Sequence, residues 1–285
     1  MLTPDFDTLP AALAKTASEA WENILERGGE ELFAALDTNS TPDSFAADLA
    51  RVLATSPFVA ESIRSRPQLL VELISSGELY ETLQEGDWLC TLRACEEQGE
   101  ELHATLRQFR RRHMLRIIWR DFCRIAATRE TVRDTSLLAE ATIDVALSHS
   151  QSELESRFGT PIGSDSGEPQ QLIVLGMGKL GARELNVSSD IDLIFVFPEA
   201  GQTQGGEKSL SNEEFFTRVG RSLISALDQV TAEGFVFRVD MRLRPYGDSG
   251  ALVHNFAALE SYYQDQGRDW ERYALIKARP LTGDP

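Results

Sequence analysis

Cysteine is scarce in this sequence, which limits the kinds of site that it can build. Among 285 residues there are three cysteines, at positions 90, 95 and 123, and no two of them form a C-x-x-C pair. The nearby His103 and His113 do not have the spacing of zinc-finger ligands. We therefore expect unreactive thiols in a reducing compartment, not a disulfide framework or a zinc site.

Positive charge and long apolar runs are also in short supply. The chain has 28 Lys and Arg against 45 Asp and Glu, a formal net charge of −17, which disfavours a nucleic-acid-binding surface. No apolar run approaches the ~20 residues that span a bilayer. The first ten residues, "MLTPDFDTLP", lack the basic start of a secretory signal. We expect a cytoplasmic protein without a membrane or nucleic-acid partner.

Two halves of the chain have different sequence periods, which predicts an α+β fold. Residues 1–156 have apolar residues spaced by three and four, with Ser56-Pro57 and Arg66-Pro67 as helix starts. Residues 157–171 are rich in Gly, Pro and Ser and are expected to be a linker. Residues 172–285 alternate apolar strands with helical segments, which predicts a small mixed sheet flanked by helices.

One helical segment, from Leu102 to Glu130, carries most of the arginine in the first half. The sequence predicts a single long amphipathic helix here. In one interpretation its arginines pair with carboxylates of neighbouring helices along a solvated flank. In the other, Arg112, Arg116 or Arg120 face a cleft that handles phosphate.

The stretch "LGMGKLGARELNVSSDIDLIF", residues 175–195, contains Gly176, Gly178 and Gly181 in a G-x-G-x-x-G pattern. A dinucleotide-binding unit needs a crossover helix after the third glycine and an acidic residue ~20 positions later. From Gly181 to Asp190 there is room for only about two helical turns. The dinucleotide interpretation is therefore rejected.

Two aspartates at the end of this stretch predict a metal site. Asp190 and Asp192 are two positions apart at the start of an apolar strand, so their side chains lie on the same face. Two carboxylates this close repel each other unless a cation neutralises them. Mg²⁺ prefers such oxygen ligands together with phosphate oxygens. The alternative is an exposed strand end with two solvated acids.

A third acidic residue follows in "FRVDMRLRPYG". Alternation along this segment places Asp240 on one strand face with Arg242 and Arg244. If this strand lies beside the Asp190 strand, three carboxylates meet with two guanidiniums beyond them. This set favours metal-dependent phosphoryl or nucleotidyl transfer, with the glycine turn and Lys179 contacting phosphate.

The motif G-x-G-K-L-G-x-x-E-L-x-x-x-S-D-I-D-L-I-F resembles the catalytic core of the glutamine synthetase adenylyltransferase/adenylyl-removing enzyme, of the polymerase-β-type nucleotidyltransferase superfamily. The resemblance continues through "FRVDMRLRPYGDSGALV" and "WERYALIKARPLTGD", and back into "FRRRHMLRIIWRD". It implies that Mg²⁺ is held by Asp190, Asp192 and Asp240. It also implies a nucleotide and phosphate site made by Gly178, Lys179, Ser189, Arg242 and Arg244.

Family members of this kind have two such cores in tandem, and this sequence resembles the N-terminal, adenylyl-removing half and ends before that half does. The resemblance implies Mg²⁺-dependent phosphorolysis: phosphate removes AMP from adenylylated glutamine synthetase and ADP is released. It also implies ADP or ATP as nucleotides and control by a PII-type nitrogen-signalling protein. Two alternatives stay open, attachment of AMP from ATP and a catalytically silent nucleotide- or regulator-binding module. Lys277 and Arg279 are either rim cations of the site or surface charges.

Overall fold

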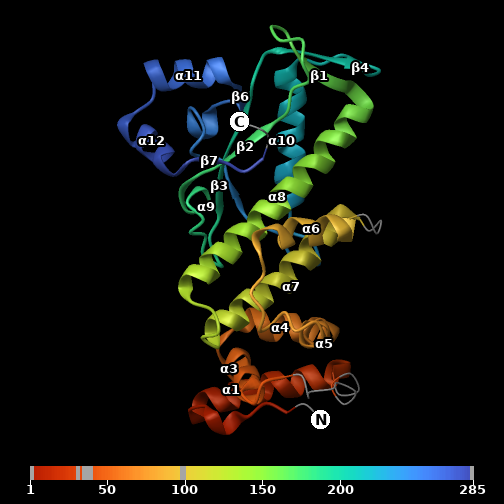
Figure 1. Ribbon diagram of the computed structural model, residues 1–285, viewed down its shortest axis with the longest axis vertical. Coiled ribbons are helices and arrows are strands. Elements are labelled where there is room, and N and C mark those ends of the chain that lie inside the picture. The colour runs from red at the N-terminus through yellow and green to blue at the C-terminus, as the bar shows by residue number, and fades with distance from the viewer. Residues whose placement is uncertain (1–2, 30–32, 34–40, 97–100, 283–285) are drawn as a thin grey trace. The chain divides into compact units, whose positions relative to one another are not determined.

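The structure, a computed structural model, describes residues 3–29, 33, 41–96 and 101–282 (Figure 1). The chain forms two compact units. Unit 1 comprises Met1–Glu85 and Phe109–Thr135, and unit 2 comprises Gly86–Gln108 and Ser136–Pro285. Residues 86–108 and 136–156, which the sequence assigned to one helical region, thus belong to the same unit as the sheet. The predicted boundaries at 157 and 172 stay a prediction of how the chain divides into domains.

Unit 1 is built from helices whose starts follow from local sequence. Ser56 caps α4 by accepting a hydrogen bond from the Val59 amide at 3.3 Å, and Pro57 occupies the first helical position. Pro67 likewise occupies the first position of α5, here without a side-chain cap from Arg66. Gly77, with φ of +76°, follows the end of this helix. Among the described residues, the α-helices before α6 (Glu85–Glu96) are α1 (Ala11–Ile24), α3 (Phe45–Thr55), α4 (Pro57–Ser65) and α5 (Pro67–Ser75).

The arginine-rich segment does not form the single helix that the sequence predicted. After α6 (Glu85–Glu96), α7 runs from Leu102 to Phe122 and α8 from Thr128 to Phe158. The chain turns between them, where Arg124 adopts a left-handed φ of +57°. The amides of Ile125 and Ala126 both donate to the carbonyl oxygen of Arg120, which satisfies the end of α7.

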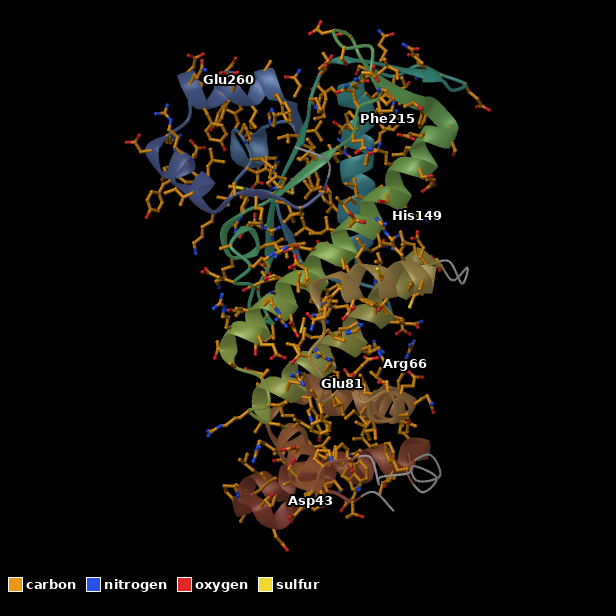
Figure 2. All side chains as sticks on the ribbon, in the orientation of Figure 1. Asp43, Arg66, Glu81, His149, Phe215 and Glu260 are labelled. Atoms are coloured by element: carbon orange, nitrogen blue, oxygen red, sulfur yellow. The ribbon has the colours of Figure 1, made fainter. Side chains whose placement is uncertain are left out.

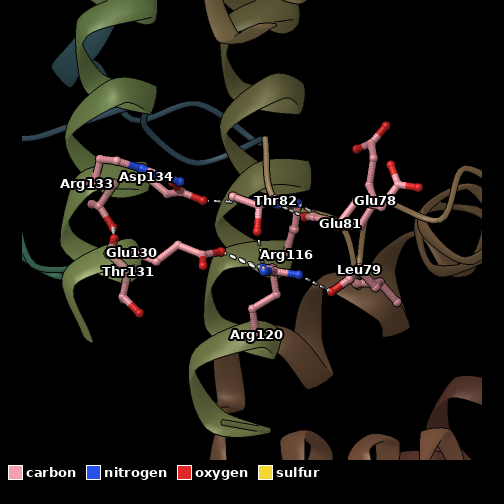
Figure 3. A network of polar contacts seen from close by, with 11 residues as sticks. Glu78, Leu79, Glu81, Thr82, Arg116, Arg120, Glu130, Thr131, Arg133 and Asp134 are labelled. Carbon is pink, nitrogen blue, oxygen red and sulfur yellow. Dashed lines mark hydrogen bonds and ion pairs between the residues drawn. The ribbon is translucent and has the colours of Figure 1, made fainter. Parts of the chain in front are cut away.

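Arg116 and Arg120, two arginines of α7 in unit 1, are buried and bind both carboxylates and backbone carbonyls (Figure 3). Arg116 is 0% exposed; it pairs with Asp134 at 3.1 Å and donates to the carbonyl oxygens of Glu78 and Glu81. Arg120 donates to Glu130 at 2.7 Å and to the Leu79 carbonyl at 3.1 Å. Arg112 pairs with Glu72 and Glu78. Pairing with carboxylates is confirmed, but Arg116 and Arg120 lie in the interior and not on a solvated flank.

Unit 2 contains a mixed five-stranded sheet within the described residues. Its order is β5-β3-β2-β7, and β6 also pairs with β3. The antiparallel pairs are β2–β3 and β2–β7, whereas β5 and β6 run parallel to β3. The strands are β2 (Ile173–Gly176), β3 (Ile191–Phe197), β5 (Val239–Asp240), β6 (Val253–Asn255) and β7 (Arg279–Pro280). Because β2 and β3 are antiparallel, the glycine turn between them cannot belong to a parallel dinucleotide-binding unit.

Helices cover both faces of β3, which explains its continuous apolar run. On one face, α10 (Asn212–Asp228) packs so closely that a Cβ at Gly220 would lie 2.9 Å from the Phe195 ring. Phe215, labelled in Figure 2, is a fully buried residue of this helix. On the other face, Ile194 and Val196 pack with residues of α11 (Phe256–Asp265), α12 (Asp269–Ala274) and η4 (Leu275–Lys277). Asp192 shares this second face by alternation.

The predicted linker contains a strand, which pairs with a segment that follows β3. Within the predicted linker, β1 (Gly159–Gly163) forms, and within the connection after β3, β4 (Gly201–Gly205) forms. They make a two-stranded antiparallel ribbon. In a sequence, glycine usually indicates a loop, but here it allows the backbones of β1 and β4 to approach closely. A Cβ at Gly201 would lie 1.9 Å from the carbonyl oxygen of Ile162.

No helix in the described part of the chain combines the length and apolar character needed to cross a membrane.

Candidate functional site

Two of the predicted aspartates are neighbours across a parallel strand pair. In the β3–β5 ladder, Ile191 pairs with Val239 and Asp192 pairs with Asp240. Residues that pair directly across a sheet direct their side chains to the same side, so both carboxylates lie on one face. The predicted convergence of Asp192 with Asp240 is therefore found, and Asp190 immediately precedes β3.

The electrostatics of Asp192 reflect this arrangement. Partial burial raises the pKa of the Asp192 carboxyl above its usual range, and the charges of Asp240 and Asp190 raise it further. Arg242 and Lys179 act in the opposite direction. A half-buried carboxylate beside two others is an unfavourable anion by itself, and neighbouring positive charge stabilises it.

Arginine side chains form hydrogen bonds with the carboxylates of Asp190 and Asp240. Arg242 makes a fork on Asp240, with Nη2 to Oδ2 at 2.5 Å and Nε to Oδ2 at 2.8 Å, and its amide donates to Oδ1 at 2.8 Å. These hydrogen bonds lower the pKa of Asp240. Arg238 Nε donates to Asp190 Oδ1 at 2.5 Å, and its Nη2 donates to the Ser188 carbonyl at 3.1 Å.

The oxygen donor set fits a hard divalent cation in its chemistry. Asp192 and Asp240 pair across the strands, and the charges of Asp240 and Asp190 both raise the pKa of Asp192. In the described residues no group of three or more His, Cys, Asp and Glu is arranged so that it could hold a metal ion as it stands. Arg238 and Arg242 occupy two of the three carboxylates, and both arginines are exposed, so a metal would have to displace them. The magnesium site stays a prediction.

The glycine turn lies directly against Asp192. The Met177 amide donates to the Asp192 carbonyl oxygen at 2.9 Å, which joins the turn to β3. Gly178 begins the four-residue helix α9 (Gly178–Gly181) with φ of +53°. A Cβ at this position would lie 3.3 Å from Asp192 Oδ2. Glycine is thus required here both by the left-handed backbone and by the close carboxylate.

Of the remaining predicted residues, Lys179 and Ser189 lie next to each other, whereas Arg244 has other partners. Lys179 Nζ lies 3.4 Å from Ser189 Oγ, so these two side chains join the turn to the segment before Asp190. Arg244 does not join the fork on Asp240. It donates to the Met241 carbonyl at 2.8 Å and lies 3.6 Å from Asp248.

The predicted strand face shared by Asp240, Arg242 and Arg244 is wrong, because β5 ends at Asp240. The Asp240 side chain accepts the Arg242 amide, which makes a turn instead of a further strand residue. Tyr246 and Gly247 then both adopt left-handed φ values, of +61° and +56°.

Several side chains around the glycine turn and the aspartates make ion pairs that the sequence did not predict. Arg238 lay in the alternating segment, but its pairing with Asp190 was not foreseen. Glu140 of α8 binds both Arg183 and Arg279, and no sequence signal marks it. Lys277 pairs with Glu184 at 2.6 Å. Lys277 and Arg279 are therefore engaged with residues around the glycine turn and are not free cations at a rim.

The fold and this geometry define the class of protein. A small mixed sheet flanked by helices, with paired aspartates and a glycine turn, is a nucleotidyltransferase-like α+β fold. The family model for glutamate-ammonia ligase adenylyltransferase matches residues 46–285. The chain belongs to this family.

Individual relatives agree with the family match. The chain is 52% identical over 297 residues to the bifunctional glutamine synthetase adenylyltransferase/adenylyl-removing enzyme of Pseudomonas aeruginosa, covering 100% of this chain and 29% of the relative. Enzymes of the same name from Pseudomonas putida and Hahella chejuensis are 56% and 50% identical, over 82% and 96% of this chain. The chain spans less than a third of these relatives, and it matches their N-terminal part.

Proposed function

We propose that this chain removes AMP from the adenylylated tyrosine of glutamine synthetase by Mg²⁺-dependent phosphorolysis. The observation that carries the proposal is the register pair of Asp192 and Asp240, with the glycine turn against Asp192. The relatives' name, which includes an adenylyl-removing activity, supplies the substrate. The relatives' name specifies glutamine synthetase as the protein that is modified, so the proposed role of this chain is in nitrogen assimilation.

In this reaction an oxygen of inorganic phosphate attacks the phosphorus of the tyrosyl-AMP diester. The bond from phosphorus to the tyrosine oxygen breaks, and the proton of the attacking phosphate ends on that oxygen. The products are ADP and free tyrosine. Both reactants are anionic, so their approach requires positive charge at the site.

Residues of this chain have separate roles in that step. Asp190, Asp192 and Asp240 would hold Mg²⁺, which neutralises phosphate charge when it is bound. The backbone of Gly178, with Lys179 and Ser189, would contact the nucleotide phosphates. Arg242, exposed and hydrogen-bonded to Asp240, would bind a phosphate oxygen through its guanidinium. Arg244 would add charge from the following turn.

The test uses the 285-residue chain with adenylylated glutamine synthetase, inorganic phosphate and Mg²⁺, and measures ADP. Asp192→Asn keeps the size of the side chain but removes the central carboxylate. We expect ADP release to fall by about 10²–10³-fold, the typical cost of losing one electrostatic stabiliser. Asp265→Asn, an exposed acid at the end of α11, is the matched control and should retain activity.

A parallel reaction distinguishes the alternatives. Unmodified glutamine synthetase is incubated with ATP and Mg²⁺, and attachment of AMP is measured. AMP attachment without phosphate-dependent ADP release would show the transfer direction and contradict the proposal. Nucleotide binding without either reaction, unaffected by Asp192→Asn, would identify a silent binding module.

A further inference from the structure

We propose that Glu140, in the middle of α8, is a positioning residue that fixes the glycine turn of the site through two arginines. The inference rests on the proposed function for its catalytic meaning, but its structural part can be tested without activity. Glu140 lies in unit 2, as do all the residues with which it is linked below.

Glu140 is shared by two guanidiniums. Arg183 donates to its two oxygens, from Nε and Nη2, at 3.2 Å each. Arg279 donates to the same two oxygens, from Nη2 at 2.5 Å and from Nη1 at 3.4 Å. The Glu140 side chain is 15% exposed. One carboxylate thus contacts two guanidiniums at a partly buried position, where both pairs are forked and hence fixed in orientation.

Arg279 spans the glycine turn from its beginning to its end. Its backbone pairs with Gly176, the last residue of β2 before the turn. Its side chain donates from Nε to the carbonyl oxygen of Gly181, the last residue of α9, at 3.0 Å. The orientation that Glu140 imposes on the guanidinium is therefore the one that satisfies this carbonyl.

Arg183 holds the chain where it leaves the turn. Its backbone has a left-handed φ of +57°, which is strained for a residue with a side chain. The ion pair with Glu140 anchors that strained residue to α8. One helical turn earlier on α8, the Ser136 hydroxyl accepts the buried amide of Leu185 at 3.1 Å. Ser136 and Glu140 lie on the same side of the helix, so this side forms a continuous support for residues 181–185.

The support reaches the reacting end of the site through a tightly packed backbone. A Cβ at Gly181 would lie 1.9 Å from the carbonyl oxygen of Lys277, so α9 has no room to shift toward η4. At the other end of α9, a Cβ at Gly178 would lie 3.3 Å from Asp192 Oδ2, so the turn begins next to this carboxylate. A loosened turn would move the amides and Lys179 relative to Asp192, where the phosphate is proposed to bind.

The experiment replaces Glu140 by Gln in the 285-residue chain. Glu140→Gln keeps the size and one acceptor but leaves two guanidiniums without their common charge. Hydrogen exchange of the peptide covering residues 177–185 is measured by mass spectrometry, and binding of ADP with Mg²⁺ by calorimetry. We expect exchange in this peptide to rise by about tenfold or more, and ADP affinity to fall by about tenfold.

Two further variants separate positioning from general destabilisation. Glu140→Asp keeps the charge with a shorter reach and should restore most of the exchange protection and part of the affinity. Asp144→Asn removes a comparable α8 ion pair, to Arg93 at 2.8 Å, which does not contact the turn. This control should leave exchange in residues 177–185 unchanged.

The outcomes identify which statement fails. Unchanged exchange at residues 177–185 in Glu140→Gln, or an equal rise in Asp144→Asn, would overturn the positioning role. A selective rise in exchange that Glu140→Asp reverses supports that role. If the unsubstituted chain then neither binds ADP with Mg²⁺ nor releases ADP, the proposed function is the part that is wrong.

Discussion

The Arg116–Asp134 pair of unit 1 and the Arg242–Asp240 pair of unit 2 differ in how far water reaches them. In unit 1, Arg116 and Asp134 are 0% and 2% exposed in their side chains, and backbone carbonyls complete the shell of the guanidinium. In unit 2, the Arg242 side chain is 74% exposed and its partner Asp240 is 15% exposed. In the Arg238–Asp190 pair both side chains are exposed.

This difference separates pairs that stabilise the fold from pairs that can be exchanged. A buried guanidinium that loses its carboxylate has no water to replace it, so the pair is fixed. An exposed guanidinium is solvated in either state, so moving it costs little. The sequence made Arg242 a candidate phosphate-binding residue, and in one of two interpretations it gave Arg116 a similar role. Burial assigns Arg116 to the interior of unit 1 and leaves Arg242 free to move.

The largest effect on stability is expected for Arg116→Met. It leaves the buried Asp134 carboxylate with Arg133 only and removes the donors to Glu78 and Glu81. We expect a loss of about 3–5 kcal/mol in the free energy of unfolding, measured by urea denaturation. The double variant with Asp134→Leu should recover part of this loss, because an apolar pair replaces an uncompensated charge.

Arg51→Met in the same unit is the control for this prediction. Its side chain is 42% exposed and lies 3.4 Å from Asp48. The loss should be under about 1 kcal/mol. Equal losses in Arg116→Met and Arg51→Met would remove the distinction between buried and exposed pairs.

A smaller effect, dependent on pH, is expected from His113 on α7. This imidazole is 3% exposed, and burial lowers its pKa to about 3, with further lowering by the charges of Arg112 and Arg116. Below about pH 6.5 the unfolded chain binds a proton on His113 that the folded chain does not. The free energy of unfolding should therefore fall as the pH drops from about 6.5 toward 3, by at most about 1.4 kcal/mol per pH unit.

His113→Leu removes this contribution. Urea unfolding at several pH values should show a shallower decline for the variant than for the unsubstituted chain. His149→Gln, which removes an exposed imidazole of α8, is the matched control and should keep the original slope. Identical slopes for His113→Leu and the unsubstituted chain would contradict the prediction.

The smallest effect on stability is expected for Arg242→Gln. The fork on Asp240 is lost, but both groups are accessible to water, so the urea midpoint should match that of the unsubstituted chain within replicate scatter. Phosphate-dependent ADP release should nevertheless fall by about 10–100-fold, because a cation at the proposed phosphate site is lost. A clear loss of stability with unchanged turnover would place Arg242 with the structural pairs.

The sequence predicted those parts of unit 2 that follow from local pattern. The run from Leu193 to Phe197 is apolar at every position, which indicates a strand covered on both faces, and α10 covers one of them. The G-x-G turn and the two-residue spacing of Asp190 and Asp192 indicated where the candidate site lies, and its role stays a prediction. Asp240 was also found, because it alternates with apolar residues up to the point where β5 ends.

What the sequence could not predict depends on tertiary contacts. The alternation of apolar and polar residues continues from Asp240 to Arg244, although the Asp240 side chain has already turned the chain. Glu140 and Arg279 are 139 positions apart, and Glu140 lies outside the motifs that carry the family resemblance. Burial of Arg116 was unpredictable for the same reason, since its partners on residues 78–82 are backbone carbonyls that any sequence offers.

The parallel register of β3 and β5 has a consequence for which length changes this protein tolerates. Asp192 meets Asp240 only while Ile191 meets Val239. A single residue inserted between Arg238 and Asp240 would place the carboxylate on the opposite face of the sheet. Insertions in the β1–β4 ribbon would not change the pairing of Asp192 with Asp240. Length variation among functional homologues should therefore accumulate at residues 163–168 and 205–209, and be absent between 236 and 240.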